Sequence, residues 1–165
     1  MPASLSLRAA LFLIAVGVVS LGAAFGSQYL GGLRPCILCI YQRYPYGVVI
    51  ALGLLALLLW RRPKLVGGLA LLAAIALFVD AGIAAFHVGV EQHWWKGTNE
   101  CSNLIDPNLS IEELKKALLE QPVVACDEVA WSLFGISMAG YNFIYASMAG
   151  LIATVLAFRL FRSPR

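Results

Sequence analysis

The chain has 165 residues, of which 61% are hydrophobic and 13% charged, and its formal net charge is +3. Soluble chains are about 45–50% apolar and about 25% charged, so this composition excludes an ordinary soluble core and a disordered chain. The modest charge gives no reason to expect nucleic-acid binding. Four membrane spans of about 21 residues would account for most of the apolar residues. We therefore predict a single membrane domain, residues 1–165, embedded in the lipid bilayer.

Four apolar runs are long enough to cross a bilayer as helices. They cover residues 9–30, 40–60, 65–86 and 136–158. At 1.5 Å per residue, 20 to 23 helical residues extend about 30–35 Å, enough to cross the hydrocarbon core. The first run is longer than the 7–15 apolar residues typical of a signal peptide, so we expect it to remain as a span. The sequence therefore predicts an all-α, four-helix transmembrane bundle.

The lysines and arginines beside these runs predict its orientation. One end would carry Arg8, Arg61, Arg62, Lys64, Arg159, Arg162 and Arg165, and the other would carry Arg34, Arg43, Lys96, Lys115 and Lys116. Short segments rich in Lys and Arg next to spans stay in the cytoplasm. We therefore expect both termini to be cytoplasmic, with residues 31–39 and 87–135 forming loops on the outer face.

The longer of these loops contains the pattern of a short amphipathic helix. Ser110 and Glu113 have the spacing of a capping box, and Pro122 would end the helix. The apolar residues between them share one face: Ile111, Leu114, Leu118 and Leu119. This helix would lie either on the membrane surface or against the folded part of the loop.

All four cysteines fall on the predicted outer face. A disulfide between Cys101 and Cys126 would close a loop of about 25 residues and stabilise the protein by about 3–3.5 kcal/mol. A bridge between Cys36 and Cys39 would close almost no loop. Cys-x-x-Cys is instead the spacing of redox-active pairs, whose thiolate is favoured at a helix N-terminus or beside a cation.

The four cysteines are also compatible with two roles outside redox chemistry. In the first, both pairs form ordinary disulfides in a structural or adaptor membrane protein. In the second, Cys-x-x-Cys is half of a zinc site, but Cys101 and Cys126 are too far apart in the sequence to form the other half, so we expect no metal. Covalent haem is excluded because Ile40 follows the motif where haem attachment needs histidine.

Local charges favour a thiol–disulfide relay. Cys39 would lie near the N-terminus of the second span, where the helix dipole favours a thiolate, and Arg43 follows one turn later. The loop cysteines instead have acidic neighbours: Glu100, Asp127 and Glu128. Because stabilising the thiolate form makes a couple more oxidising, these charges favour electron flow from the loop pair to the Cys-x-x-Cys pair.

The electrons then need an acceptor. The chain has no glycine fingerprint for a dinucleotide and no haem ligand set, and the Cys-x-x-Cys pair lies at the membrane boundary beside Arg43 and several tyrosines. A quinone fits this position, since its carbonyl oxygens accept hydrogen bonds and an arginine can stabilise the charge that develops on reduction. We predict a membrane quinone, ubiquinone or menaquinone, with Arg43 as a contact.

At these residues the chain resembles the DsbB family of bacterial inner-membrane thiol oxidases. The likeness rests on residues 35–43 (PCILCIYQR), on a second cysteine pair after the third span, and on residues 131–140 before the fourth. Vitamin K epoxide reductase-like proteins also couple disulfides to quinones, but they carry the two pairs in the opposite order.

The resemblance implies a role for each site residue. Cys101 would form the mixed disulfide with a periplasmic DsbA-like thioredoxin-fold protein, Cys126 would exchange with Cys36, and Cys39 would face the quinone. Arg43 matches the quinone-side arginine of the family. The chain would then be a multi-pass protein of the bacterial inner membrane.

Two ionisable residues in or next to the third run are further candidates. His87, at its outer end, would contact the quinone or donate a proton to it, unless it is an ordinary interfacial histidine. Asp80 would lie about one and a half turns from the outer end, where we expect an interfacial structural role.

Overall fold

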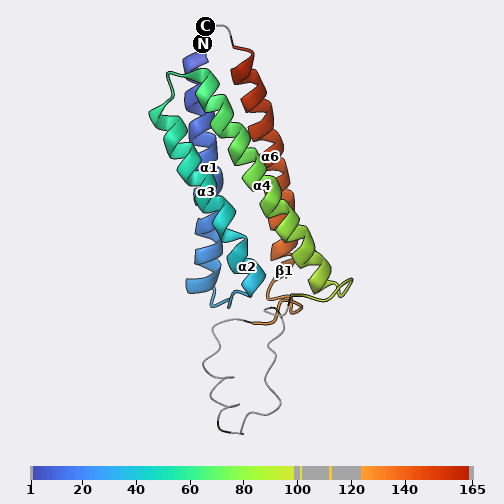
Figure 1. Cartoon of the computed structure of the whole chain (residues 1–165). Helices are drawn as coiled ribbons and strands as arrows, with labels where there is room; N and C mark the ends of the chain where they lie inside the picture. Colours follow the sequence, from blue (N-terminus) through green and yellow to red (C-terminus); the bar gives the residue numbers. More distant parts are fainter. Residues whose placement is uncertain (1, 99–100, 102–111, 113–123, 164–165) are drawn as a thin grey trace.

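A computed structural model describes residues 2–98, 101, 112 and 124–163 (Figure 1). Its helices are α1 (Pro2–Tyr29), α2 (Ile37–Tyr41), α3 (Arg43–Leu58), α4 (Pro63–Glu91) and α6 (Met138–Phe161). Two short strands, β1 (Ser132–Leu133) and β2 (Ile136–Ser137), form an antiparallel hairpin just before α6.

Four segments are long and apolar enough to cross a membrane. They are Ser4–Tyr29, Ile37–Leu58, Pro63–Glu91 and Met138–Phe161, with mean hydropathies from 1.3 to 2.4. The second combines α2 and α3. The predicted all-α, four-helix fold is therefore confirmed, and the chain is a multi-pass membrane protein. The amphipathic helix expected between Ser110 and Pro122 lies outside the described residues.

Two helices extend further toward the cysteine end than the apolar runs indicated. The second span begins at Ile37, three residues before the predicted start, and α4 continues past Phe86 to Glu91. Apolar runs mark where a chain crosses hydrocarbon, whereas a helix can continue past such a run, because its hydrogen bonds are made by the backbone. Cys39 and His87 therefore lie on helices, and the predicted loops 31–39 and 87–135 are shorter at these ends.

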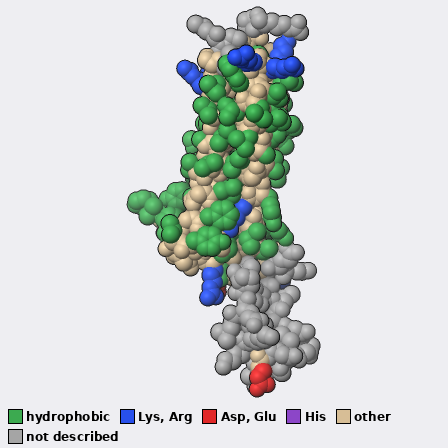
Figure 2. Space-filling view, turned by 90° about the vertical axis from the view of Figure 1, so that its left-hand side faces the viewer, with side chains coloured by type: hydrophobic (Ala, Val, Ile, Leu, Met, Phe, Trp, Pro, Cys, Tyr) green, Lys and Arg blue, Asp and Glu red, His purple; other side chains and the backbone are tan. Residues whose placement is uncertain are grey.

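The four spans form two neighbouring pairs. In Figure 1, α1 lies beside α3 and α4 beside α6, and these two pairs have the most extensive contacts in the bundle. Both termini and the turn between α3 and α4 lie at one end, and α2 and β1 lie at the other. Figure 2 shows basic side chains gathered at the terminal end and apolar side chains along the length of the bundle.

Small residues allow the helices to approach closely. The main core cluster contains Leu77 and six alanines of α4 and α6: Ala70, Ala73, Ala74, Ala149, Ala153 and Ala157. Such residues are typical of membrane helix interfaces because they let backbones come together and gain van der Waals contact. The larger apolar side chains instead point outward, where lipid would surround them: Val19, Leu58 and Leu72 are more than half exposed.

Gly53 lies at a close contact between α1 and α3. A Cβ atom there would lie 2.9 Å from Ile14 Cγ1 and 3.0 Å from the Ile14 backbone nitrogen, whereas a Cβ at Gly47 of the same helix would meet nothing within 4 Å.

We predict that Gly53→Ala lowers the free energy of unfolding by about 1–3 kcal/mol, because the added methyl group overpacks this contact. The matched control Gly47→Ala should raise it by about 0.5–1 kcal/mol through helix propensity. Thermal unfolding in detergent, followed by circular dichroism, measures both, and equal effects would contradict the close contact.

Candidate redox site

The Cys-x-x-Cys pair lies at the N-terminus of the second span. Cys36 is the N-cap of α2, and its sulfur accepts a hydrogen bond from the Cys39 backbone N–H at 3.2 Å. Both cysteines are free, and their sulfur atoms are 2.7 Å apart. Cys39 lies in the first helical turn, where the positive end of the helix dipole favours negative charge. The hydrogen bond to Cys39, together with burial, raises the pKa of the Cys36 thiol well above its ordinary value.

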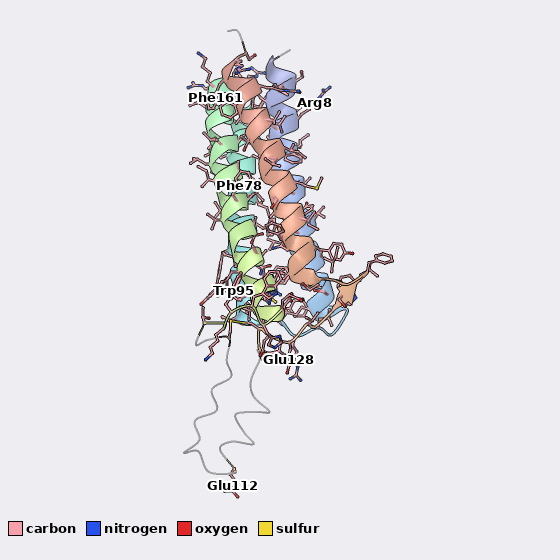
Figure 3. The ribbon with its side chains drawn as sticks, turned by 90° about the vertical axis from the view of Figure 1, so that its right-hand side faces the viewer. Arg8, Phe78, Trp95, Glu112, Glu128 and Phe161 are labelled. Carbon is pink, nitrogen blue, oxygen red and sulfur yellow. A yellow bond between two sulfur atoms is a disulfide. The ribbon has the colours of Figure 1, made fainter. Side chains whose placement is uncertain are left out.

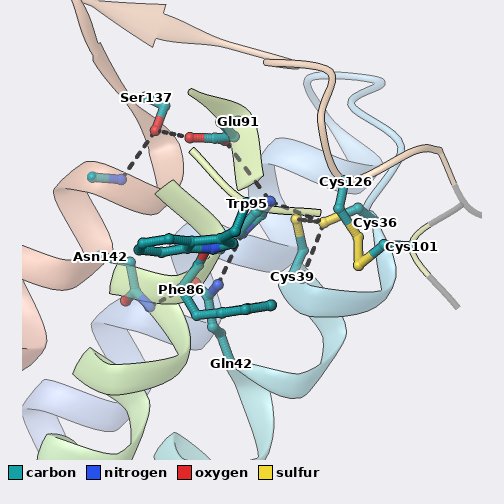
Figure 4. Close-up of polar contacts among 12 residues, drawn as sticks. Cys36, Cys39, Gln42, Phe86, Glu91, Trp95, Cys101, Cys126, Ser137 and Asn142 are labelled. Carbon is teal, nitrogen blue, oxygen red and sulfur yellow. Dashed lines mark hydrogen bonds and ion pairs between the residues drawn. A yellow bond between two sulfur atoms is a disulfide. The ribbon is translucent and has the colours of Figure 1, made fainter. Parts of the chain in front are cut away.

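The loop cysteines are joined to each other and packed against this pair. Cys101 and Cys126 form a disulfide with a Cα–Cα distance of 5.0 Å. Both are buried in the same apolar cluster as Cys36, with Cys39 packed against it (Figure 4). A backbone bridge between Cys36 and Val124 connects the two segments. Cysteines that are up to 90 residues apart in the sequence therefore share one cluster at one end of the bundle.

His87 lies between the cysteines and the polar interior. Its Nε2 is 3.4 Å from Cys36 Sγ, and its Nδ1 is 3.0 Å from Gln42 Nε2. The side chain is only 4% exposed. His87 is thus a buried neighbour of Cys36.

A chain of polar side chains continues from Gln42 into the bundle. Asn142 Nδ2 donates hydrogen bonds to Gln42 Oε1 at 2.8 Å and to Asp80 Oδ2 at 2.9 Å. The Tyr46 hydroxyl donates to Asn142 Oδ1 at 2.6 Å. These contacts connect three spans, because Gln42 and Tyr46 belong to the second, Asp80 to α4 and Asn142 to α6.

Asp80 lies further from the end of its helix than the one and a half turns that the sequence indicated. Its side chain is completely buried, and α4 continues 11 residues beyond it, about 16 Å of helix. The prediction failed because it ended the helix at Phe86. Asp80 instead belongs to the polar interior, and its Oδ1 has no hydrogen-bond partner among the described residues.

A second branch leads from His87 toward the hairpin. Glu91, one turn further along α4, places Oε1 at 3.8 Å from His87 Nε2. Its other oxygen accepts a hydrogen bond from the Ser137 hydroxyl (Figure 4). Ser137 also caps α6, because its oxygen accepts from the Gly140 backbone N–H at 3.1 Å. The start of the fourth span is thus held against the end of the third.

A cavity of about 540 Å³ opens beside the cysteines. Its walls come from α1, α2, α3, α4, α6 and the segment before α6, and they include Cys36, Cys39, Arg43 and His87. The Arg43 guanidinium lies over the Phe25 ring at 4.8 Å, and its buried Nε has no hydrogen-bond partner among the described residues. In Figure 3, Trp95 and Glu128 lie at this end of the bundle, and Arg8 and Phe161 lie at the opposite end.

The same groups could also bind a soft metal ion. The sulfur atoms of Cys36 and Cys39 and a ring nitrogen of His87 all lie within 4.8 Å of one another. The sequence argument against a metal depended on the missing second half of a zinc site, and the fold brings in one further donor, His87. Three donors are the number that catalytic zinc sites use.

The structure brings together all six residues singled out in the sequence. They are Cys36, Cys39, Arg43, His87, Cys101 and Cys126. Sequence reasoning missed four polar partners: Gln42, Glu91, Ser137 and Asn142. Two signals could have pointed to them, since Gln42 lies inside the Cys-x-x-Cys motif region and Glu91 follows His87 by four residues on one helix face.

A four-helix membrane bundle with two cysteine pairs clustered at one end defines a class of membrane thiol–disulfide oxidoreductases. Comparisons with known proteins identify the family. The sequence profile of disulfide bond formation protein DsbB matches residues 6–156. The chain therefore belongs to the DsbB family and is a disulfide-bond-forming membrane oxidoreductase.

Individual relatives agree with this assignment. Disulfide bond formation protein B of Methylobacillus flagellatus is 34% identical over 152 residues, 89% of each chain. That of Polaromonas naphthalenivorans is 32% identical over 165 residues, 94% of this chain and 93% of its own. The uncharacterized protein RP370 of Rickettsia prowazekii is 30% identical over 136 residues, 81% of this chain and 77% of its own. No solved structure matches the chain.

Proposed function

We propose that this protein oxidises the dithiol of a periplasmic DsbA-like thioredoxin-fold protein and passes the electrons through its two cysteine pairs to a membrane quinone. One observation carries the proposal: the loop disulfide and the Cys-x-x-Cys thiols lie in one buried cluster beside a cavity that contains Arg43. Two disulfides that only stabilised loops would have no need of this proximity.

The first exchange takes electrons from the partner protein. A partner thiolate attacks Cys101 Sγ, and Cys126 leaves as a thiolate. The second partner thiol then attacks the mixed disulfide. The partner becomes a disulfide and both loop cysteines become thiols, so two electrons and two protons have moved.

The second exchange restores the loop disulfide. The Cys126 thiolate attacks Cys36 of an oxidised Cys36–Cys39 pair, and Cys39 leaves as a thiolate. Cys101 then attacks Cys126, which releases Cys36. The observed redox state, with the loop pair bonded and the Cys-x-x-Cys pair free, corresponds to the end of this step.

The cavity beside Cys39 fits a quinone head group. Its walls are mainly apolar, and the unpartnered Arg43 Nε supplies a hydrogen-bond donor for a carbonyl oxygen. A bound quinone supplies an acceptor for two electrons and two protons. Arg43 would hold and orient the head group, while Cys39 lies on the same wall and His87 contributes a ring nitrogen nearby.

The distribution of basic residues supports the proposed orientation in a bacterial inner membrane. Both termini and the turn between α3 and α4 share one end, which carries Arg8, Arg61, Arg62, Lys64, Arg159 and Arg162. With that end in the cytoplasm, the cysteines face the periplasm, where disulfides persist.

The order of electron transfer predicts separable defects. In the purified protein, Cys101→Ser should abolish oxidation of a reduced thioredoxin-fold partner, because no loop disulfide is left to attack. The Cys36–Cys39 pair should still be oxidised by a short-chain quinone, which counting of free thiols measures. Cys39→Ser is the matched control and should lose the quinone reaction. Loss of quinone reactivity in the Cys101 variant would overturn the order.

The orientation predicts the behaviour of a reporter enzyme that is active only in the periplasm. A fusion after Lys96 should be active, and a fusion after Pro63 should be silent. Equal expression of both fusions, checked by immunoblotting, is the control. The opposite pattern would put the cysteines in the reducing cytoplasm and contradict the proposal.

Arg43 separates quinone binding from simple anchoring. An arginine that only reached the lipid headgroups could be replaced by lysine, but one whose planar fork binds a carbonyl oxygen could not. Loss of one charge-assisted hydrogen bond of about 1.5–3 kcal/mol predicts that Arg43→Lys raises the apparent quinone KM about 10- to 150-fold, with Arg43→Ala worse. Arg62→Lys, at the opposite end, should leave the KM unchanged. Unchanged kinetics in both Arg43 variants would make Arg43 an anchor only.

A further inference from the structure

We propose that Asp80 is a positioning residue that acts through Asn142 and Gln42 to place the proton of the neutral His87 ring on Nε2, facing Cys36. The assignment of the tautomer follows from the hydrogen bonds alone. Its consequence for catalysis rests on the proposed function. Nitrogen-15 NMR measures the position of the proton directly, so the tautomer and the proposed function can fail separately.

The first link is the carboxylate of Asp80. A carboxylate has acceptor atoms only, so the atom of Asn142 that faces it must be the amide nitrogen. Both distances from that nitrogen agree, at 2.9 Å to Asp80 Oδ2 and 2.8 Å to Gln42 Oε1. The Tyr46 hydroxyl donates to the oxygen on the other side. The side-chain nitrogen of Asn142 is therefore a hydrogen-bond donor to Asp80 and Gln42, and its side-chain oxygen is an acceptor from Tyr46.

The second link is Gln42. Because Asn142 presents an N–H, the atom of Gln42 that meets it must be the oxygen. Gln42 Nε2 is then the group that faces His87 Nδ1 at 3.0 Å. An amide nitrogen donates and does not accept, so Nδ1 must be the unprotonated nitrogen of the ring.

The opposite side of the ring leads to the same assignment. Nε2 lies 3.4 Å from Cys36 Sγ, which can accept a hydrogen bond, and 3.8 Å from Glu91 Oε1, which can only accept as a carboxylate. A donor thus faces Nδ1 and acceptors face Nε2. Because a donor faces Nδ1, the single proton of the neutral ring lies on Nε2, where the surrounding groups can accept it.

This tautomer decides what His87 does for Cys36. With N–H toward the sulfur, the ring stabilises negative charge on Cys36 when this cysteine is released from its mixed disulfide with Cys126. With the opposite tautomer, a lone pair would face the sulfur, and the ring could only take the thiol proton. The structure therefore assigns His87 the role of hydrogen-bond donor to the leaving sulfur. No proton needs to leave the ring in this step.

The position of the proton can be measured by nitrogen-15 NMR of histidine-labelled protein. The chain has two histidines, so His93→Asn leaves His87 as the single signal. Asparagine suits that position because residue 93 has a φ of 58°, which asparagine tolerates. The resting full-length protein, without quinone or partner, should show a protonated Nε2 and a bare Nδ1. A bare Nε2, or a ring protonated on both nitrogens, would overturn the proposal.

Exchanging the first two links should move the proton. In the double variant Asp80→Asn with Asn142→Asp, a carboxylate and an amide still face each other, but residue 142 is now the carboxylate and can only accept hydrogen bonds. Gln42 must then turn its nitrogen toward residue 142 and its oxygen toward His87, so Nδ1 becomes protonated. A purely structural role for Asp80 predicts no change, because the shapes and the net charge are kept. An unprotonated Nδ1 in this double variant would contradict the proposal.

Gln42→Glu tests the last link by itself and does not depend on the folding of the double variant. A carboxylate facing Nδ1 should again place a proton there, and an unprotonated Nδ1 would overturn the proposal. Where Nε2 loses its proton, the rate of partner oxidation should fall at least about 10-fold, the effect of losing one hydrogen bond to a charged group. An unchanged rate would contradict the role in releasing Cys36. If the protein without these substitutions does not oxidise a reduced thioredoxin-fold partner, the proposed function is refuted. The NMR spectra would still decide the tautomer of His87.

Discussion

The structure depends on one constraint: polar groups inside a membrane bundle must find their partners within the protein, because hydrocarbon offers none. Gln42, Asp80, His87, Glu91 and Asn142 all lie on the inner side of spanning helices, and each is hydrogen-bonded or within ion-pair distance of another group in the set. These contacts connect the second, third and fourth spans at the level of the cysteines. Because a buried polar group left without a partner costs several kcal/mol, the contacts restrict how the three helices can rotate against one another.

Close packing and this polar network support each other. Alanines and glycines along α4 and α6 bring the backbones close enough for short side chains such as Asp80 and Asn142 to meet. Further along, the same two helices are connected by Ser137 and Glu91, at the point where the hairpin leads into α6. The cysteine cluster therefore lies on a rigid end of the bundle, which suits a centre whose sulfur atoms must meet in a defined order.

Two environments meet at the cysteines. The loop disulfide is buried: Cys126 has no exposed surface and Cys101 is 4% exposed, so the proposed partner protein would have to displace part of its cover before exchange could begin. The Cys-x-x-Cys pair instead lines an apolar cavity with Arg43 in its wall. Protein thiols and a lipid-soluble acceptor would thus approach from different sides, and electrons could pass between them only through the four cysteines. Under the proposed function, this separation would explain why the protein uses two cysteine pairs in series instead of one pair that reacts with both.

The sequence by itself determined the number of spans, the end of the bundle that carries the cysteines and the redox character of the Cys-x-x-Cys pair, because apolar length, basic flanks and cysteine spacing are local properties. It also singled out Arg43 and His87 by their positions at span ends. Only the tertiary structure decided that Asp80 is buried and that α4 continues to Glu91. It also decided that Asn142 contacts Asp80, 62 residues earlier in the sequence, and Gln42, 100 residues earlier. Those contacts depend on the rotation of each helix about its own axis, and this rotation is set by packing. The sequence of a uniformly apolar span does not encode it, because such a span has almost no amphipathic face.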